Sequence, residues 1–219
     1  MNSDVKSIFL CNPNNPTSIL TSPAQIEEIV QAALAQNILV FLDEDFLEFI
    51  YNDEKYSLIS KINNYPNLFI LRSFTKLYGL TGLRIGYGIA SEEIIRVLSN
   101  AKIPWNINCL GQVAAIAALD DKTHLTKTLD LIKAEKPFLL EGLSKFKSLK
   151  LISPDANFVL VDVRKTGFTA AQLKAKLLTF GILIRDCSSF AGLDQYFIRV
   201  AIKTHFENEK LLEALQKTL

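Results

Sequence analysis

The chain has 219 residues, of which 49% are apolar and 21% are charged, with 24 basic and 23 acidic side chains. This composition excludes a disordered chain and is sufficient for a buried core in one large or two small domains. The net charge of +1 gives no electrostatic reason to expect a nucleic acid or an anionic membrane as partner. No run approaches the ~20 apolar residues of a membrane span, and the first residues lack the pattern of a signal peptide.

The cysteines and histidines argue for a cytoplasmic protein without a metal site. Cys11, Cys109 and Cys187 are far apart in the sequence, so they form no CxxC motif and no disulfide framework. His124 and His205 lie near predicted helix ends with no third metal ligand close in sequence.

Strands and helices alternate over the first half of the chain. A helix is predicted from Pro23 to about residue 36, capped by Thr21 or Ser22, and a second one follows Ser91. Apolar runs between turn signals predict four strands, at residues 6–12, 38–43, 67–73 and 85–90. The strand at 38–43 is apolar almost throughout, which predicts cover on both faces. This order indicates an α/β fold with a mostly parallel sheet.

The pattern changes after about residue 107. Residues 107–147 read as helical, with an interruption near Asp120–Asp121 and a bend at Pro137. Shorter elements follow, which we predict as strands at 149–154, 156–163, 182–186 and 196–202 and helices at 169–179 and from Glu207 onwards. We therefore predict a partial large α/β domain over residues 1–120 and a small α+β domain over 121–219.

Polar side chains collect where the early strands end. Asn15 follows the first strand, Asp43 ends the second, and Ser73 ends the third and leads to Lys76. Ligands of open α/β sheets bind beyond the carboxyl ends of the strands, so these side chains are expected at one edge. An amine near a carboxylate and near Arg84 suits pyridoxal 5′-phosphate, whose aldehyde forms a Schiff base with lysine. Arg84 and Ser73 would then hold the cofactor phosphate.

The segments NPNNPT, FLDEDF and SFTKLYGLTGLRIGY resemble the fold type I pyridoxal-phosphate aminotransferases in order and spacing. The resemblance implies that Lys76 carries the cofactor, that Asp43 pairs with the ring nitrogen and that Asn15 faces the ring hydroxyl. It also implies that Ser73 and Arg84 bind the phosphate. The implied fold is the C-terminal part of the large α/β domain plus the small α+β domain, in a protein that is a homodimer when complete.

Within this family, the chain resembles the histidinol-phosphate aminotransferase branch and, most of all, the L-threonine-O-3-phosphate decarboxylases. That finer resemblance rests on LDEDFLEFI, IPWNIN and ILIRDCSSFAGLDQYFIRVAIKT. It implies decarboxylation of threonine phosphate to (R)-1-amino-2-propanol O-2-phosphate in cobamide biosynthesis. Transamination of the histidinol-phosphate type is the alternative, because the sequence cannot reveal which substrate bond is broken.

The sequence departs from the family pattern in three places. Ser18 stands where many members have Gly, which is expected to alter a turn, and Phe46 stands where many carry a Tyr that donates to the ring hydroxyl. The threonine-phosphate decarboxylases share this Phe. The family also has further sheet strands and a Gly-rich phosphate loop before the first strand seen here, so we expect an N-terminally truncated chain, which as an isolated fragment could be inactive.

Two arginines of the second region are candidates for substrate anions. Arg199 lies inside an apolar strand, where a buried charge needs a partner. By resemblance, Arg199 faces the substrate α-carboxylate, Arg185 the substrate phosphate, and Asn15 also borders the substrate. Packing or local turns are the preferred interpretation for Glu48, Tyr78, Trp105 and Asn106.

Overall fold

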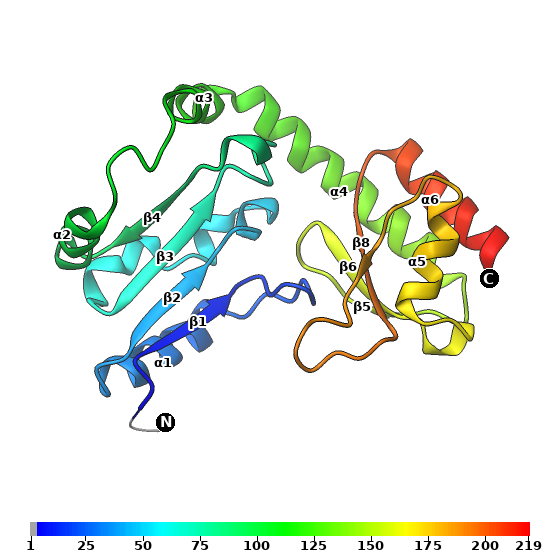
Figure 1. Cartoon of the computed structure of the whole chain (residues 1–219), viewed down its shortest axis with the longest axis horizontal. Coiled ribbons are helices and arrows are strands. Elements are labelled where there is room, and N and C mark those ends of the chain that lie inside the picture. The colour runs from blue at the N-terminus through cyan, green and yellow to red at the C-terminus, as the bar shows by residue number, and fades with distance from the viewer. Residues whose placement is uncertain (1–3) are drawn as a thin grey trace. The chain divides into compact units, whose positions relative to one another are not determined.

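The computed structural model describes residues 4–219, which form two compact units (Figure 1). The first unit comprises the chain up to Asn14 together with Leu20–Thr126, and the second comprises Asn15–Ile19 together with Lys127–Leu219. The short segment Asn15–Ile19 thus belongs to the second unit although it is surrounded in sequence by the first. Each unit is described below by itself.

The first unit is built on a four-stranded sheet in the order β1-β2-β3-β4 (Figure 1). The strands are β1 (Ser7–Cys11), β2 (Leu39–Asp43), β3 (Leu68–Ser73) and β4 (Gly86–Ala90). The pairs β1–β2 and β2–β3 are parallel, and β3–β4 is antiparallel. All four predicted strands and the mostly parallel sheet are therefore confirmed.

Helix α1 (Pro23–Leu34) covers one face of this sheet. Ser22 is its N-cap and forms a capping box with Gln25, and Pro23 occupies the first turn, where its missing N–H is not needed. Its buried residues pack against the inward side chains of β2 and β3 in one core, formed by Ile26, Val30, Ala33, Val40, Leu42, Leu68 and Ile70. The alternation along β2 places every second side chain in this core.

The opposite face of the sheet carries a ladder of aromatic rings. Phe9 and Phe41 stack with ring centroids 4.7 Å apart, and Phe41 lies 5.7 Å from Phe69. Phe69 lies so close to β4 that a Cβ on Gly88 would come within 2.1 Å of its ring. In β2, Phe41 is half-buried and Leu39 is 43% exposed, so the cover on both faces that is predicted for residues 38–43 is incomplete in the described chain. Phe9, the outer ring of the ladder, belongs to β1 and is 73% exposed.

Three further helices follow, α2 (Glu92–Ala101), α3 (Cys109–Asp120) and α4 (Lys122–Ser144). Ser91 is the N-cap residue of α2, but its side chain makes no capping hydrogen bond, contrary to the simplest reading of the sequence. The predicted interruption is confirmed, since α3 ends at Asp120, and α4 continues as a helix through Pro137. Within residues 4–219, five 3₁₀ segments complete the short elements, at Leu47–Phe49, Asp53–Lys55, Ile59–Asn64, Thr81–Leu83 and Arg164–Thr166.

The second unit has an antiparallel sheet in the order β5-β6-β8-β7. Its strands are β5 (Lys150–Ile152), β6 (Phe158–Asp162), β7 (Arg185–Asp186) and β8 (Phe197–Ala201), and its helices besides α4 are α5 (Ala170–Leu178) and α6 (His205–Thr218). The residues of β6 from Phe158 to Val161 are all buried, as are Leu173 and Leu177 of α5 and Leu211 and Leu215 of α6. This is the α+β arrangement that the sequence predicts.

Ser18 explains how the segment Asn15–Ile19 joins the second unit. Its φ of 64° lies in the left-handed region, which favours the Gly found in many relatives of this motif. The Ser18 hydroxyl accepts a hydrogen bond from the Ala156 N–H at 2.9 Å, and its carbonyl oxygen accepts one from the Asp155 N–H at 2.8 Å. These two bonds attach the segment to the turn before β6 and compensate for the backbone strain.

No helix within residues 4–219 combines the length and the apolar character needed to traverse a bilayer.

Candidate active site

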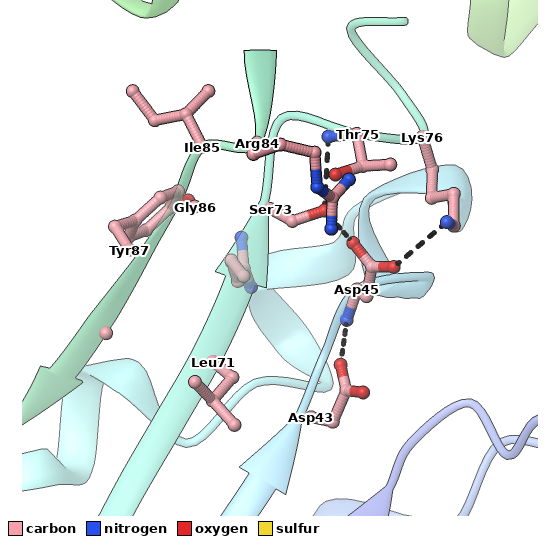
Figure 2. A pocket seen from close by; sticks show the side chains of 12 residues that line it. Asp43, Asp45, Leu71, Ser73, Thr75, Lys76, Arg84, Ile85, Gly86 and Tyr87 are labelled. Carbon is pink, nitrogen blue, oxygen red and sulfur yellow. Dashed lines mark hydrogen bonds and ion pairs between the residues drawn. The ribbon is translucent and has the colours of Figure 1, made fainter. Parts of the chain in front are cut away.

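A pocket lies at the carboxyl ends of β2 and β3 in the first unit (Figure 2). Because β2 and β3 are parallel, with Asp43 paired with Leu71, the chain leaves both strands at the same edge of the sheet. The polar side chains that line the pocket include Asp43, Asp45, Ser73, Thr75, Lys76 and Arg84. The structure thus brings together four of the residues predicted from the sequence, which are Asp43, Ser73, Lys76 and Arg84.

Lys76 stands in a tight turn after β3. Its neighbours Phe74 and Leu77 are only 4% and 3% exposed and anchor the turn in the core, whereas the Lys76 side chain is 42% exposed. The Gly79 N–H donates to the Lys76 carbonyl oxygen at 3.2 Å, which closes the turn. The fold therefore holds the backbone of Lys76 rigidly and presents its amine to the pocket.

Arg84 lies at the start of the strand that returns along the pocket. Its φ of 52° is in the left-handed region, and its Nη1 donates to the Thr81 carbonyl oxygen at 3.0 Å. Arg84 is exposed, and within residues 4–219 no acidic side chain forms an ion pair with it. Its guanidinium group is consequently available to an anion in the pocket.

Asp45 is the pocket residue that the sequence analysis missed. Figure 2 shows its carboxylate between Ser73 and Lys76. The Ser73 hydroxyl donates a hydrogen bond to Asp45 Oδ1, and Lys76 Nζ lies 4.0 Å from Asp45 Oδ2. The Thr75 N–H donates to Ser73 Oγ at 3.1 Å. The acidic run DED at the end of the second predicted strand is the signal in the sequence that indicates Asp45.

Asp43 lies deeper than Asp45, at the end of β2. Its Oδ1 accepts a hydrogen bond from the Asp45 N–H at 2.9 Å. Burial raises the pKa of Asp43 above its usual value, and the neighbouring Asp45 carboxylate adds to this, while that hydrogen bond and the Lys76 charge act in the opposite direction. Asp43 is thus a carboxylate whose affinity for a proton is enhanced by its surroundings.

A second charged cluster centres on Arg72, which also lines the pocket. The Arg72 Nε and Nη2 donate to Glu44 Oε2 at 3.0 Å and 2.9 Å, and Nη1 donates to Asp53 at 3.2 Å. Glu44 is 1% exposed and also accepts a hydrogen bond from the Ser57 hydroxyl, whose oxygen lies 3.0 Å from Oε1 and 2.8 Å from Oε2. Glu44 separates Asp43 from Asp45 in the chain but does not line the pocket.

Glu48 completes this cluster. Its Oε1 lies 3.9 Å from Arg72 Nη1, and its Oε2 is buried without a hydrogen-bond partner among the described residues. Burial raises the pKa of Glu48 to about 7, despite the opposing charge of Arg72. Burial and the Glu48 charge raise the pKa of Tyr78 to about 12. Packing is therefore part of the role of Glu48, as predicted, but the residue is also a buried titrating group.

Arg199 and Asn15 meet in the second unit. Arg199 Nη1 donates to Asn15 Oδ1, and the guanidinium carbon lies 4.8 Å from the centroid of the Phe158 ring. Within residues 4–219, no acidic side chain forms an ion pair with Arg199. Burial and the nearby Arg185 lower the pKa of Arg199. A half-buried cation without an acid partner is suited to bind an external anion.

Arg185 is the residue opposite Arg199 in the β7–β8 ladder. It is exposed and donates to the Ser189 hydroxyl at 3.2 Å. Asn157 belongs to the same unit, and its Oδ1 is buried without a hydrogen-bond partner among the described residues. The second unit therefore offers two neighbouring guanidinium groups. Asn15 belongs to this unit, whereas the other predicted cofactor residues belong to the first.

Comparison with known proteins gives the family. The model of "Aminotransferase class I and II" matches residues 1–216. A histidinol-phosphate aminotransferase of Methanosphaera stadtmanae is 39% identical over 97% of this chain, which spans 56% of that relative. The crystal structure of the histidinol-phosphate aminotransferase from Clostridium acetobutylicum superposes with a TM-score of 0.91 at 37% identity, covering 98% of this chain and 64% of that one.

The structure of L-threonine-O-3-phosphate decarboxylase from Porphyromonas gingivalis is also similar, with a TM-score of 0.87 at 27% identity over 98% of this chain and 65% of that one. The chain thus spans a little over half of the length of the curated relatives it matches. Its fold is that of the fold type I pyridoxal-phosphate-dependent transferases, and the resemblance read from the three motifs is confirmed. This chain belongs to the aminotransferase class I and II family.

Proposed function

We propose that the pocket at Lys76 binds pyridoxal 5′-phosphate and serves transamination of the histidinol-phosphate type. The observation that carries the proposal is that one pocket is lined by the exposed Lys76, by the Asp43 carboxylate, and by Ser73 and Arg84. These groups fit the cofactor, because a carboxylate suits the protonated ring nitrogen and a hydroxyl with a guanidinium suits the phosphate.

Each residue has a separate task in this proposal. When bound, pyridoxal phosphate supplies an aldehyde that takes up an amine and a ring that accepts electrons from the substrate α-carbon. Lys76 Nζ would hold the cofactor through this aldehyde, and the same amine would move a proton at the substrate α-carbon. Asp43 would accept a hydrogen bond from the protonated ring nitrogen. Arg84 and Ser73 orient the phosphate.

Asn15 is proposed as the donor to the ring hydroxyl. Its Oδ1 is occupied by Arg199, which leaves the Nδ2 amide protons as its donors. Phe46 is buried and has no hydroxyl, so this role cannot be shared with the residue that is Tyr in many aminotransferases.

The choice of reaction rests on the comparisons with known proteins, and the number of anionic groups on each substrate then sets the roles of the two arginines. The sequence motifs favour threonine-phosphate decarboxylation, but curated relatives of this chain at 35–41% identity are histidinol-phosphate aminotransferases. They favour the alternative. Threonine phosphate carries a carboxylate and a phosphate, whereas histidinol phosphate carries the phosphate alone. In the transamination proposal, Arg185 binds the substrate phosphate and Arg199 the carboxylate of the amino acceptor.

Decarboxylation stays a second candidate because of one residue. Phe46 is the side chain that the threonine-phosphate decarboxylases share, and the Porphyromonas gingivalis enzyme of that name has a similar fold. The homodimer and the cytoplasmic location that the sequence implies remain predictions.

A product assay separates the two candidates. The 219-residue chain is incubated with pyridoxal phosphate and either histidinol phosphate plus an α-keto acid, or L-threonine O-3-phosphate alone. We expect conversion of the keto acid to an amino acid in the first mixture and no CO₂ in the second. Release of CO₂ from threonine phosphate would establish the decarboxylase instead, and the absence of both products would refute a catalytic role for this chain.

A further inference from the structure

The pocket at Lys76 contains an acidic group where its proposed ligand is acidic. Ser73 and Arg84 are the proposed phosphate-binding residues, yet the Ser73 hydroxyl is hydrogen-bonded to the Asp45 carboxylate. A serine hydroxyl has a single proton, so it cannot donate fully to Asp45 and to a phosphate at the same time. The Thr75 N–H already donates to Ser73 Oγ, so both the donor and one acceptor position of Ser73 are used within the turn.

We propose that Asp45 is an internal competitor for the anion site: its carboxylate occupies Ser73, and a phosphate group binds only by taking that hydroxyl from it. This inference rests on the proposed function only in the identity of the phosphate-bearing ligand. Asp45 is in this sense a specificity-determining residue, which lowers the affinity of the site for phosphate.

The position of Asp45 supports competition rather than a structural role. Its backbone N–H is already satisfied by Asp43 Oδ1 at 2.9 Å, so the chain direction after β2 does not depend on the Asp45 side chain. Its carboxylate has a second attraction, since Lys76 Nζ lies 4.0 Å from Oδ2. When an anion accepts the hydrogen bond of the Ser73 hydroxyl in place of Asp45, the Asp45 carboxylate can remain near Lys76. The anion can therefore displace Asp45 from Ser73 without leaving a buried unpaired charge.

The neighbouring acid shows what a carboxylate with a purely structural role looks like in this unit. Glu44 is 1% exposed, bonds Arg72 through two nitrogens and accepts from Ser57. Asp45, in contrast, lines the pocket and is held by one hydroxyl and one distant amine. Its negative charge acts directly on any anion that approaches Ser73 and Arg84.

Asp45→Asn tests the proposal, because it removes the charge and keeps the shape. We would measure the dissociation constants of the full chain for inorganic phosphate, for pyridoxal 5′-phosphate and for pyridoxal, which lacks the phosphate. Asp45→Asn and Asp45→Ala should bind inorganic phosphate and pyridoxal phosphate about tenfold more tightly than wild type, by the usual size of a neighbouring-charge effect. Their affinity for pyridoxal should change much less. Asp120→Asn, which removes an exposed carboxylate at the end of α3, is the matched control and should change none of the three.

A double variant tests the route through Ser73. In a Ser73→Ala background, Asp45→Asn should gain much less affinity for phosphate, because the contested hydroxyl is absent. Equal or weaker phosphate binding by both Asp45 variants, with cooperative unfolding retained, would overturn the proposal, and so would the absence of phosphate binding in every protein. Failure of the proposed function has a different signature, since it would appear as pyridoxal attachment to a lysine other than Lys76 whatever the phosphate constants are.

Discussion

Two groups of acidic side chains lie near the carboxyl end of β2, and their surroundings differ. Asp43 and Asp45 line the pocket with Lys76, which is 42% exposed. Glu44, the residue between them, is buried with Arg72 and shares it with Asp53 and Glu48. The first group faces a solvent-accessible cation, whereas Arg72 in the second is bonded through all three of its guanidinium nitrogens.

The difference distinguishes a group that stabilises the fold from one that can bind a ligand. Arg72 has already bonded its three nitrogens inside the protein, so it has little left to offer an external anion. Arg84 and Lys76 are exposed and have weaker internal partners, so a ligand can recruit them at small cost. Two arginines of the same region thus differ in role because they differ in burial: Arg72 stabilises the fold, and Arg84 can bind a ligand.

The largest expected effect comes from removing the centre of the buried cluster. Arg72→Met should lower the free energy of unfolding at pH 7 by about 3–5 kcal/mol, since it leaves buried carboxylates without their cation. Urea unfolding monitored by circular dichroism measures this. Arg84→Met is the matched control, because Arg84 is exposed, and it should leave the urea midpoint close to that of wild type. Equal losses in the two variants would refute the contrast between the clusters.

A smaller effect is expected from Glu48, whose pKa is raised to about 7. A carboxyl group with a raised pKa in the folded state stabilises the fold below its usual pKa of 4.5, and this contribution is lost as the pH rises through 7. The unfolding free energy of wild type should therefore fall between pH 5 and pH 8 by roughly 2–3 kcal/mol more than that of Glu48→Gln. The variant should also be the more stable protein at pH 8.

Asp43, Glu44 and Asp53 have raised pKa values too and act in the same direction, but they are present in both proteins. The comparison therefore isolates Glu48. Parallel pH profiles for wild type and Glu48→Gln would show that Glu48 does not titrate in this range.

The smallest effect on stability is expected for Asp43→Asn. The amide keeps the oxygen that accepts the Asp45 N–H and removes a charge that burial disfavours, so stability at pH 7 should stay within about 1 kcal/mol of wild type. Transamination should fall by at least about a hundredfold, because an amide cannot hold the proton of the ring nitrogen. Thermal unfolding and the keto acid assay measure the two quantities. A fully active variant would remove Asp43 from its proposed role.

The sequence predicted the elements well because their signals are local. The start of α1 is signalled by Ser22 as N-cap and by Pro23 in the first turn. Like the apolar runs of β2 and β3 and the short spacing from Ser73 to Lys76, these signals involve only residues close together in the sequence. The predicted meeting of Asp43 and Lys76 also needed only the rule that parallel strands end at one edge.

What the sequence did not reveal depends on side chains that come from distant segments. The Ser73–Asp45 hydrogen bond joins residues 28 positions apart, and the Arg199–Asn15 hydrogen bond joins residues 184 positions apart. No periodicity encodes such pairs. The titration of Glu48 was likewise hidden, since its pKa is set by burial and by the competing charges around Arg72. The aromatic ladder of Phe9, Phe41 and Phe69 was obscured by the uniformly apolar character of the strands.

The central claim is that Lys76 is the amine that the pocket presents to the aldehyde of the cofactor. The most direct measurement is borohydride reduction of the full chain with pyridoxal 5′-phosphate, followed by peptide mapping. The label should lie on Lys76, should be absent from Lys76→Ala and should persist in Lys102→Ala, which removes an exposed lysine outside the pocket. A label on any other lysine in wild type, or an undiminished label in Lys76→Ala, would contradict the account.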